Sequence, residues 1–155
     1  MIREATIDDL KSLAALYKEF MIFHNKIAPQ SFKVPDDSVC EDKIKYYMDS
    51  PLKYINVLCH ETDNLIDGFL IYVLLNRESS GENPNGIIHI NNIFVAENAR
   101  HKGIGTEFIN TVLKYGKEKY CNCVTVDVYP ENSIARKFYE KMGMIPTTIQ
   151  LEKRL

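Results

Sequence analysis

The sequence predicts an α/β fold in which a mixed, mostly antiparallel sheet carries helices on both faces. Segments rich in Ile, Val, Leu and Tyr alternate along the chain with segments whose apolar residues recur at helical spacing. Turn-forming residues separate these segments, and no internal repeat is present. A length of 155 residues is typical of one domain, so we expect residues 1–155 to form a single domain.

The first fifty residues predict one short strand and two helices. Residues 2–5 alternate apolar and polar side chains, and Thr6 with Asp9 three positions later resembles a capping box. The helix that follows has one apolar stripe, which favours packing on a sheet. The residues of this stripe are Leu10, Leu13, Ala14, Tyr17, Phe20 and Met21. Residues 27–35 then predict a loop and residues 36–48 a second helix.

The middle of the chain predicts a β-hairpin. Residues 54–59 and 65–75 are rich in strand-forming residues, and the polar stretch 61–64 between them is typical of a hairpin turn. Residues 76–86 are polar and rich in turn formers, so we expect an exposed loop there.

The last seventy residues predict alternating strands and helices. Residues 87–95 predict a strand, residues 103–115 a helix, residues 123–129 a strand with alternating valines, and residues 133–142 a helix that ends at Gly143. Residues 144–155 are expected to return as one or two strands.

Composition excludes several classes of function. A formal net charge of -2 and a pI of about 6.1 argue against a nucleic-acid-binding protein, which needs a basic surface. No apolar run approaches the roughly 18 residues of a membrane span. Without a signal peptide or paired C-x-x-C spacing, the four cysteines indicate a reduced, cytoplasmic protein. Cys121 and Cys123 could bind a metal, although strand-edge thiols are the simpler interpretation.

A strand that runs directly into a helix carries the clearest chemical signal. Residues 93–95 end the strand, and the helix opens after Arg100-His101-Lys102-Gly103. A helix start offers unpaired N–H groups and partial positive charge to phosphate, and glycine at 103 and 105 allows close approach. Arg100 and Lys102 add charge. Because Phe108 replaces the third glycine of G-x-G-x-x-G and no G-K-[ST] follows, neither a dinucleotide-binding fingerprint nor a P-loop is present.

Two motifs at this end of the chain resemble those of the GNAT superfamily of N-acetyltransferases. The R-x-x-G-x-G core within residues 93–105 resembles its coenzyme A motif, and residues 132–143 resemble its N-x-x-A-x-x-F-Y-x-x-x-G block. Residues 2–9 are similar to its first strand and helix, whereas residues 24–86 contribute little. The resemblance implies an acetyltransferase that uses acetyl-coenzyme A and no metal.

The resemblance also implies which residues bind the donor. The end of the strand at residues 87–95 would separate from its neighbour and offer backbone groups to the pantetheine arm, with the amide of Ile93 polarising the thioester carbonyl. Asn132 would cap the last helix and contact the coenzyme. The full donor-binding set comprises Ile93, Phe94, Val95, Arg100, His101, Lys102, Gly103, Ile104, Gly105, Thr106, Asn132, Ala135, Phe138 and Tyr139.

Tyr139 and His89 are the candidate catalytic residues. Tyr139 aligns with the tyrosine that protonates the departing thiolate in many members of the superfamily. Many relatives have a Glu in the central strand, but this chain has His89-Ile90-Asn91-Asn92 there. His89 is therefore the candidate base, directly or through water, with Asp127 and Glu97 as weaker candidates.

Asn91 and Asn92 are the candidate acceptor-binding residues. Asparagine is disfavoured in strands, so the pair could orient the acceptor or support a distortion of the strand. His89 and Asn91 should share one sheet face unless a bulge intervenes. Residues 24–50 and 76–86 are expected to complete the acceptor side, which would receive a primary amine of a small molecule, peptide or protein.

Two further expectations concern partners and activity. A non-catalytic acyl-coenzyme A-binding regulatory module is the alternative function, because the central strand has no carboxylate. Similar proteins commonly dimerise, and an exposed terminal strand could support a homodimer.

Overall fold

A five-stranded sheet forms the centre of the molecule. The computed structural model describes residues 1–50, 54–75 and 86–153. The strands lie in chain order across the sheet, antiparallel except for the parallel last pair. They are β1 (Ile2–Glu4), β2 (Ile55–Thr62), β3 (Leu65–Leu75), β4 (Ile87–Val95) and β5 (Cys123–Val126). The predicted mixed, mostly antiparallel sheet is confirmed.

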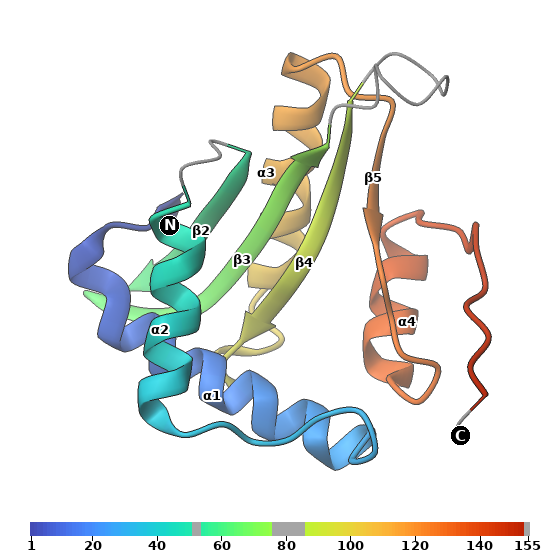
Figure 1. Ribbon diagram of the computed structural model, residues 1–155. Coiled ribbons are helices and arrows are strands. Elements are labelled where there is room, and N and C mark those ends of the chain that lie inside the picture. Colours follow the sequence, from blue (N-terminus) through green and yellow to red (C-terminus); the bar gives the residue numbers. More distant parts are fainter. Residues whose placement is uncertain (51–53, 76–85, 154–155) are drawn as a thin grey trace.

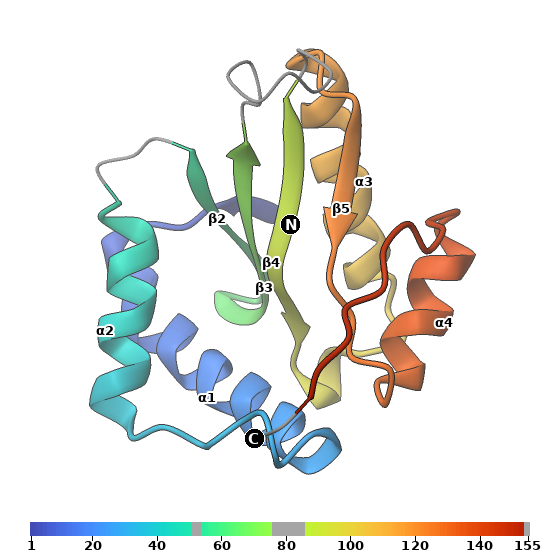
Figure 2. The ribbon, with the colours of Figure 1, turned by 45° about the vertical axis from the view of Figure 1, so that its right-hand side comes forward.

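Helices cover both faces of the sheet, as predicted. Figure 1 shows α1 (Leu10–Ile27) and α2 (Asp37–Met48) in front of the sheet and α3 (Ile104–Glu118) behind it. The last helix, α4 (Ser133–Lys141), lies beside β5. Short 3-10 turns, η1 (Ile7–Asp9) and η2 (Glu97–Ala99), precede α1 and follow β4. Figure 2 shows the loop between α1 and α2 passing below the lower ends of the strands.

Each face of the sheet has its own hydrophobic core. On the α1 and α2 face, apolar residues of both helices pack on inward-facing residues of β2, β3 and β4, which are Val57, Cys59, Phe69, Ile71 and Phe94. On the opposite face, α3 and Tyr139 of α4 pack on Leu58, Leu70, Tyr72, Ile88 and Ile90. Because alternate residues of each strand feed the two cores, the sheet is apolar on both sides.

An ion-pair network fixes the start of α1 to the sheet. Arg3 on β1 binds both carboxylate oxygens of Asp9, at 2.7 and 2.9 Å, and also contacts Glu61 of β2 at 2.7 Å. Asp9 in turn accepts from the backbone N–H of Thr6 at 2.8 Å, which is the carboxylate half of the predicted capping box. Hydrogen bonds from Arg3 and Thr6 lower the pKa of Asp9 to about 2, against the opposing effect of its burial.

The hairpin turn between β2 and β3 has the predicted position. Asp63 and Asn64 both have positive φ angles, 50° and 62°. Two successive residues with φ above zero are the signature of a type I′ turn, whose twist matches that of the strands it joins.

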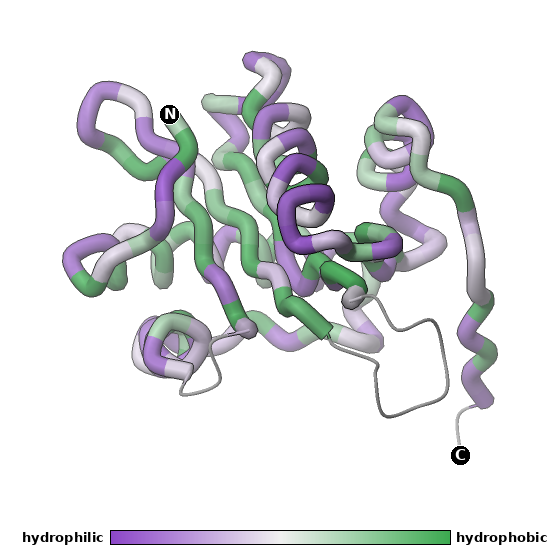
Figure 3. The backbone as a smooth tube through the Cα atoms, turned by 90° about the horizontal axis from the view of Figure 1, so that it is seen from above, coloured by the Kyte–Doolittle hydropathy of each residue, from purple (hydrophilic) through white to green (hydrophobic). Residues whose placement is uncertain are grey.

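The C-terminal segment differs from the prediction of one or two strands. Within the described part of the chain, residues 142–153 contain no strand, and they run as an extended segment past α4 (Figure 1). Its large aliphatic side chains are exposed: Ile145, Ile149 and Leu151. Figure 3 shows hydrophobic and hydrophilic stretches alternating toward the end of this segment. An extended segment becomes a strand only where a neighbouring strand supplies backbone hydrogen bonds.

None of the helices within the described residues is both long enough and apolar enough to cross a lipid bilayer.

Candidate active site

The connection between β4 and α3 is a turn that opens onto a helix start. His101 and Gly103 have positive φ angles of 64° and 86°, and Gly103 is the N-cap of α3. A Cβ atom built at Gly103 would meet no atom within 4 Å, so the space beside this residue is free. Because the first N–H groups of a helix lack partners within it, this corner can hold an anion.

The side chains around this corner differ in their exposure. His101, Lys102 and Thr106 are exposed, whereas Ile104 is buried in the core beneath α3. An open depression of ≈ 500 Å³ lies along the exposed side of the helix start, lined by Gly103, Thr106, Glu107, Asn110, Thr111 and Lys114. The corner therefore presents backbone N–H groups and the side chain of Lys102. Ile104 can contribute only its backbone N–H group, because its side chain is buried.

Arg100 ties the end of β4 to the turn. Its Nε donates to the carbonyl oxygen of Val95 at 3.0 Å. Its guanidinium carbon lies 5.4 Å from the ring centroids of both Phe23 and Phe94, within the range of a cation–π contact. Arg100 thus has a positioning role that its place in the sequence motif did not indicate.

Gly105 has a structural reason to be glycine that the sequence did not indicate. A Cβ atom at this position would lie 3.3 Å from the Cζ atom of Phe138 on α4. The missing side chain lets α3 and α4 approach each other. The two predicted motifs, one at the start of α3 and one on α4, therefore meet at this contact.

β4 and β5 separate before β4 ends. Their pairing covers residues 87–90 of β4, and the last pair is Ile90 with Val126. Further along, the N–H group of Ala96 donates to the carbonyl of Asp67. In an antiparallel pair, every second residue directs its backbone groups at the partner strand, so Phe94 also directs its groups toward β3. The backbone groups of Ile93 and Val95 then face the side that β5 has left. This opening has the position expected for a splayed strand end.

A β-bulge at Asn91 changes which residues share a face. β3 pairs Ile71 with Asn92 and Tyr72 with Ile90, so Asn91 has no partner in the register. Beyond the bulge the alternation is shifted by one residue. His89 therefore shares the α1 and α2 face with Asn92, and simple alternation between His89 and Asn91 does not hold. A strand distortion, one of the two roles considered for the asparagine pair, is present at this point.

His89 lies between β4 and β5 at the edge of the opening. Its Nδ1 is 2.9 Å from the hydroxyl of Thr125, the residue paired with it on β5. Its Nε2 is 3.8 Å from the carboxylate of Asp127. The side chain of Asp127 is 93% exposed and that of His89 28% exposed, so water screens their attraction. Glu97 is also exposed, but it lies in η2 beyond the far end of β4.

α4 brings Tyr139 and Asn132 toward the same region. The side chain of Asn132 accepts a hydrogen bond from the N–H of Ala135 at 3.1 Å, and so caps the helix as expected. Tyr139 is buried, and this burial raises its pKa far above the usual range for a phenol. The hydroxyl of Tyr139 therefore stays protonated at neutral pH.

A row of aromatic rings links α1 to the loop after β5, and sequence reasoning did not find it. His24 lies 4.1 Å from Phe20 and 5.0 Å from Phe32 between ring centroids, and Phe32 lies 5.0 Å from Tyr129. Burial lowers the pKa of His24. Only the spacing of Phe20 and His24, one turn apart on a helix, was visible in the sequence. The row joins residues from the predicted acceptor region, 24–50, to the loop after β5.

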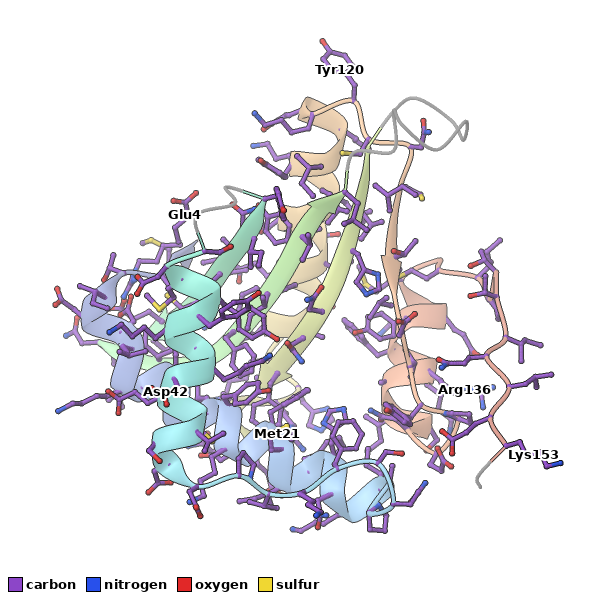
Figure 4. The ribbon with its side chains drawn as sticks, in the orientation of Figure 1. Glu4, Met21, Asp42, Tyr120, Arg136 and Lys153 are labelled. Atoms are coloured by element: carbon purple, nitrogen blue, oxygen red, sulfur yellow. The ribbon has the colours of Figure 1, made fainter. Side chains whose placement is uncertain are left out.

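The other segments expected on the acceptor side are residues 76–86, which are described only in part, and α2. The predicted loop at residues 76–86 lies, up to residue 85, outside the described residues. Figure 4 shows Asp42 of α2 pointing away from the sheet, as expected of an acidic helix face in solvent. In the described part of the chain, no cluster of three His, Cys, Asp or Glu residues could hold a metal ion.

Comparison with known sequences identifies the family. The profile of the acetyltransferase (GNAT) family matches residues 13–144. Two curated relatives, both aminoglycoside N(6')-acetyltransferase type 1, come from Salmonella typhimurium and Salmonella enteritidis. Each is 26% identical over 85 residues, which cover 55% of this chain and 59% of the relative. The match thus spans less than two thirds of these relatives' length.

Solved structures share the fold. A mutant of the BH1408 protein from Bacillus halodurans has a TM-score of 0.89 at 23% identity, covering 100% of this chain and 99% of that one. Aminoglycoside N-acetyltransferase AAC(6')-Iy in complex with CoA has a TM-score of 0.78 at 19% identity, covering 100% and 93%. At these identities the likeness concerns the fold alone.

Proposed function

The chain belongs to the acetyltransferase (GNAT) family, and on this premise we propose that it transfers an acetyl group from acetyl-coenzyme A to a primary amine. The observation that carries the proposal is the opening between β4 and β5, which adjoins the open helix start at Gly103. The helix start suits a diphosphate, and the opening suits an extended pantetheine arm that ends in a thioester. We further propose that residues 1–155 act as one domain.

The donor is held chiefly by backbone groups in this proposal. The N–H groups at the start of α3 bind the diphosphate, with Lys102 adding charge. Ile93 and the N–H group of Val95 pair with the pantetheine arm, because their backbone groups face the opening, while the carbonyl of Val95 accepts from Arg100. The amide of Ile93 stabilises the oxyanion that develops on the thioester carbonyl.

The chemistry is a direct transfer. The nitrogen of a neutral amine attacks the thioester carbon, a C–N bond forms, and the C–S bond breaks. His89 accepts the proton that the amine loses, directly or through water. When Nδ1 donates to Thr125, the lone pair of Nε2 is free for this proton. Tyr139 donates its proton to the departing thiolate.

The acceptor is proposed to be a small molecule or peptide that carries a primary amine. The names of the curated relatives make aminoglycosides the first compounds to try. The acceptor would enter on the α1 and α2 face, where His89, Asn92 and the aromatic row lie. We propose that no metal takes part.

Tyr139→Phe tests the acid. We expect kcat to fall about 10²-fold or more, since only the proton donor is lost, while acetyl-coenzyme A binding changes little. The measurement follows free thiol with acetyl-coenzyme A and a panel of aminoglycosides, simple amines and peptides. Calorimetry with the donor is the control. An unchanged rate in an active protein would refute the role of Tyr139.

The alternative function remains a non-catalytic acyl-coenzyme A-binding module, because β4 has no carboxylate. It predicts donor binding by calorimetry without turnover of any amine. Acetylation that depends on His89 would exclude it.

We also propose that the protein forms a homodimer. The supporting observation is the extended C-terminal segment, in which Ile149 and Leu151 are 87% and 91% exposed. Large exposed aliphatic side chains on an extended backbone favour pairing with another strand. Light scattering measures the mass in solution.

A further inference from the structure

The amide of Asn92 contains a buried polar atom without a partner. Its Oδ1 is inaccessible to solvent and forms no hydrogen bond, and among the described residues it is the one buried side-chain polar atom left in this state. A buried unpaired acceptor destabilises a fold by roughly 1–3 kcal/mol. An apolar side chain of the same shape would avoid this cost, so a role outside folding is the natural explanation for asparagine here.

The position of Asn92 in the sheet relates it to the reaction. The bulge at Asn91 places Asn92 on the same face as His89, opposite Ile71 of β3. At this level of β4 the pairing with β5 has already ended, because the last pair is at Ile90. Asn92 is therefore the next residue toward the helix start on the face that carries the candidate base, beside the opening.

We propose that Oδ1 of Asn92, which is shielded from solvent in the free protein, accepts a hydrogen bond from the attacking amine when the acceptor is bound and thereby selects primary over secondary amines. This inference rests on the proposed acetyl transfer. A neutral primary amine has two N–H groups: one donates to Oδ1, and the proton of the other passes to His89 after attack. The nitrogen lone pair stays directed at the thioester carbon. A secondary amine has a single N–H group and cannot satisfy both partners.

Asn92→Leu separates this role from a structural one. Leucine is similar in size and removes the unpaired oxygen, so we expect Tm to stay the same or to rise by a few degrees. The same variant should lose about 10- to 100-fold in kcat/KM for a primary amine. A lower Tm with unchanged kcat/KM would show that Asn92 serves the fold and would overturn the proposal.

The amine selectivity gives a readout that a structural role would not move. Wild type and Asn92→Leu are each assayed with benzylamine and N-methylbenzylamine, or with the corresponding pair built on the best acceptor found. We expect the primary-to-secondary ratio of kcat/KM to fall about tenfold or more in the variant. Glu118→Leu, an exposed position at the C-terminal end of α3 and outside the candidate site, is the control and should keep the wild-type ratio.

Three outcomes are distinguishable. If wild type acetylates no amine, the proposed function fails. If wild type is active and the ratio is unchanged in Asn92→Leu, only the present inference fails. If calorimetry shows that the variant has lost acetyl-coenzyme A affinity instead of amine selectivity, Oδ1 contacts the donor, and the inference is again overturned.

Discussion

At the scale of single residues, the proposed chemistry depends most on His89. It replaces the carboxylate that many relatives have in the central strand, and its partners are a hydroxyl on one ring nitrogen and a solvated carboxylate near the other. Thr125 is the partner that can fix the ring, because it is paired with His89 across the sheet. The sequence offered His89 as a candidate but did not reveal Thr125, which is 36 residues away.

His89→Gln should lower kcat/KM by about 10²- to 10³-fold, because the side chain keeps its polarity but can no longer accept a proton. Thr125→Val should lower kcat/KM by roughly 3- to 10-fold, since it removes only the hydrogen bond that orients the ring. Both effects are measured by thiol release at saturating donor. Asp127→Asn provides the comparison: if it lowers the rate more than His89→Gln does, the base is Asp127, and the assignment of His89 is wrong.

At the scale of elements, prediction succeeded where local patterns determine structure. The stripe of α1, the hairpin turn at residues 61–64 and the glycine after α4 all reflect interactions within a few residues. The bulge at Asn91 and the early end of β5 do not, because both depend on how a strand meets its neighbour. Residues 127–129 were predicted as strand, yet β5 ends at Val126, where it leaves β4.

The same distinction holds for the candidate site. The spacing of the two motifs identified the turn at Gly103 and the helix that bears Tyr139, since short sequence patterns encode both. Whether Asn91 or Asn92 shares the face of His89 was left open, because alternation alone cannot show whether a bulge is present. The aromatic row that ends at Tyr129 was not predicted, because Phe20, Phe32 and Tyr129 are distant from one another in the sequence.

The contact between α3 and α4 makes a prediction about Gly105. Gly105→Val should destabilise the protein by about 1–3 kcal/mol, because the new side chain meets Phe138. In a Phe138→Ala background the penalty should be clearly smaller. Urea unfolding of the four proteins in this double-mutant cycle measures the coupling. Equal penalties in both backgrounds would mean that Phe138 is not what requires glycine at 105.

At the scale of the whole molecule, the network around Arg3 joins the first strand, the start of α1 and β2. It also makes stability depend on pH. The folded pKa of Asp9 is lowered to about 2, so its contribution is complete above the unfolded pKa near 4 and is lost as pH falls toward 2. The loss arises because Asp9 takes up its proton in the unfolded chain at a higher pH than in the folded protein.

Asp9→Asn should therefore cost about 1–2 kcal/mol of unfolding free energy at pH 7, a figure reduced for the partial exposure of Arg3. The difference from wild type should shrink by roughly half between pH 5 and pH 3. Urea unfolding at several pH values measures this. A difference that stays constant down to pH 3 would show that charge on Asp9 is not the cause.

The C-terminal segment exposes side chains on the surface of the molecule. In Figure 4, Lys153 points away from the rest of the molecule at the end of this segment, and Tyr120 does the same at the opposite side. Its charge explains the exposure of Lys153, but the aliphatic residues of the segment are exposed without such a reason. A second copy of the chain is therefore the proposed partner.

The most direct test of the central claim is a crystal structure of the protein with coenzyme A. The account predicts that the diphosphate binds the N–H groups at the start of α3, beside Gly103, and that the pantetheine arm lies along Ile93 and Val95 with its sulfur near Tyr139. A coenzyme bound elsewhere, with the corner at Gly103 and the gap between β4 and β5 unused, would contradict it.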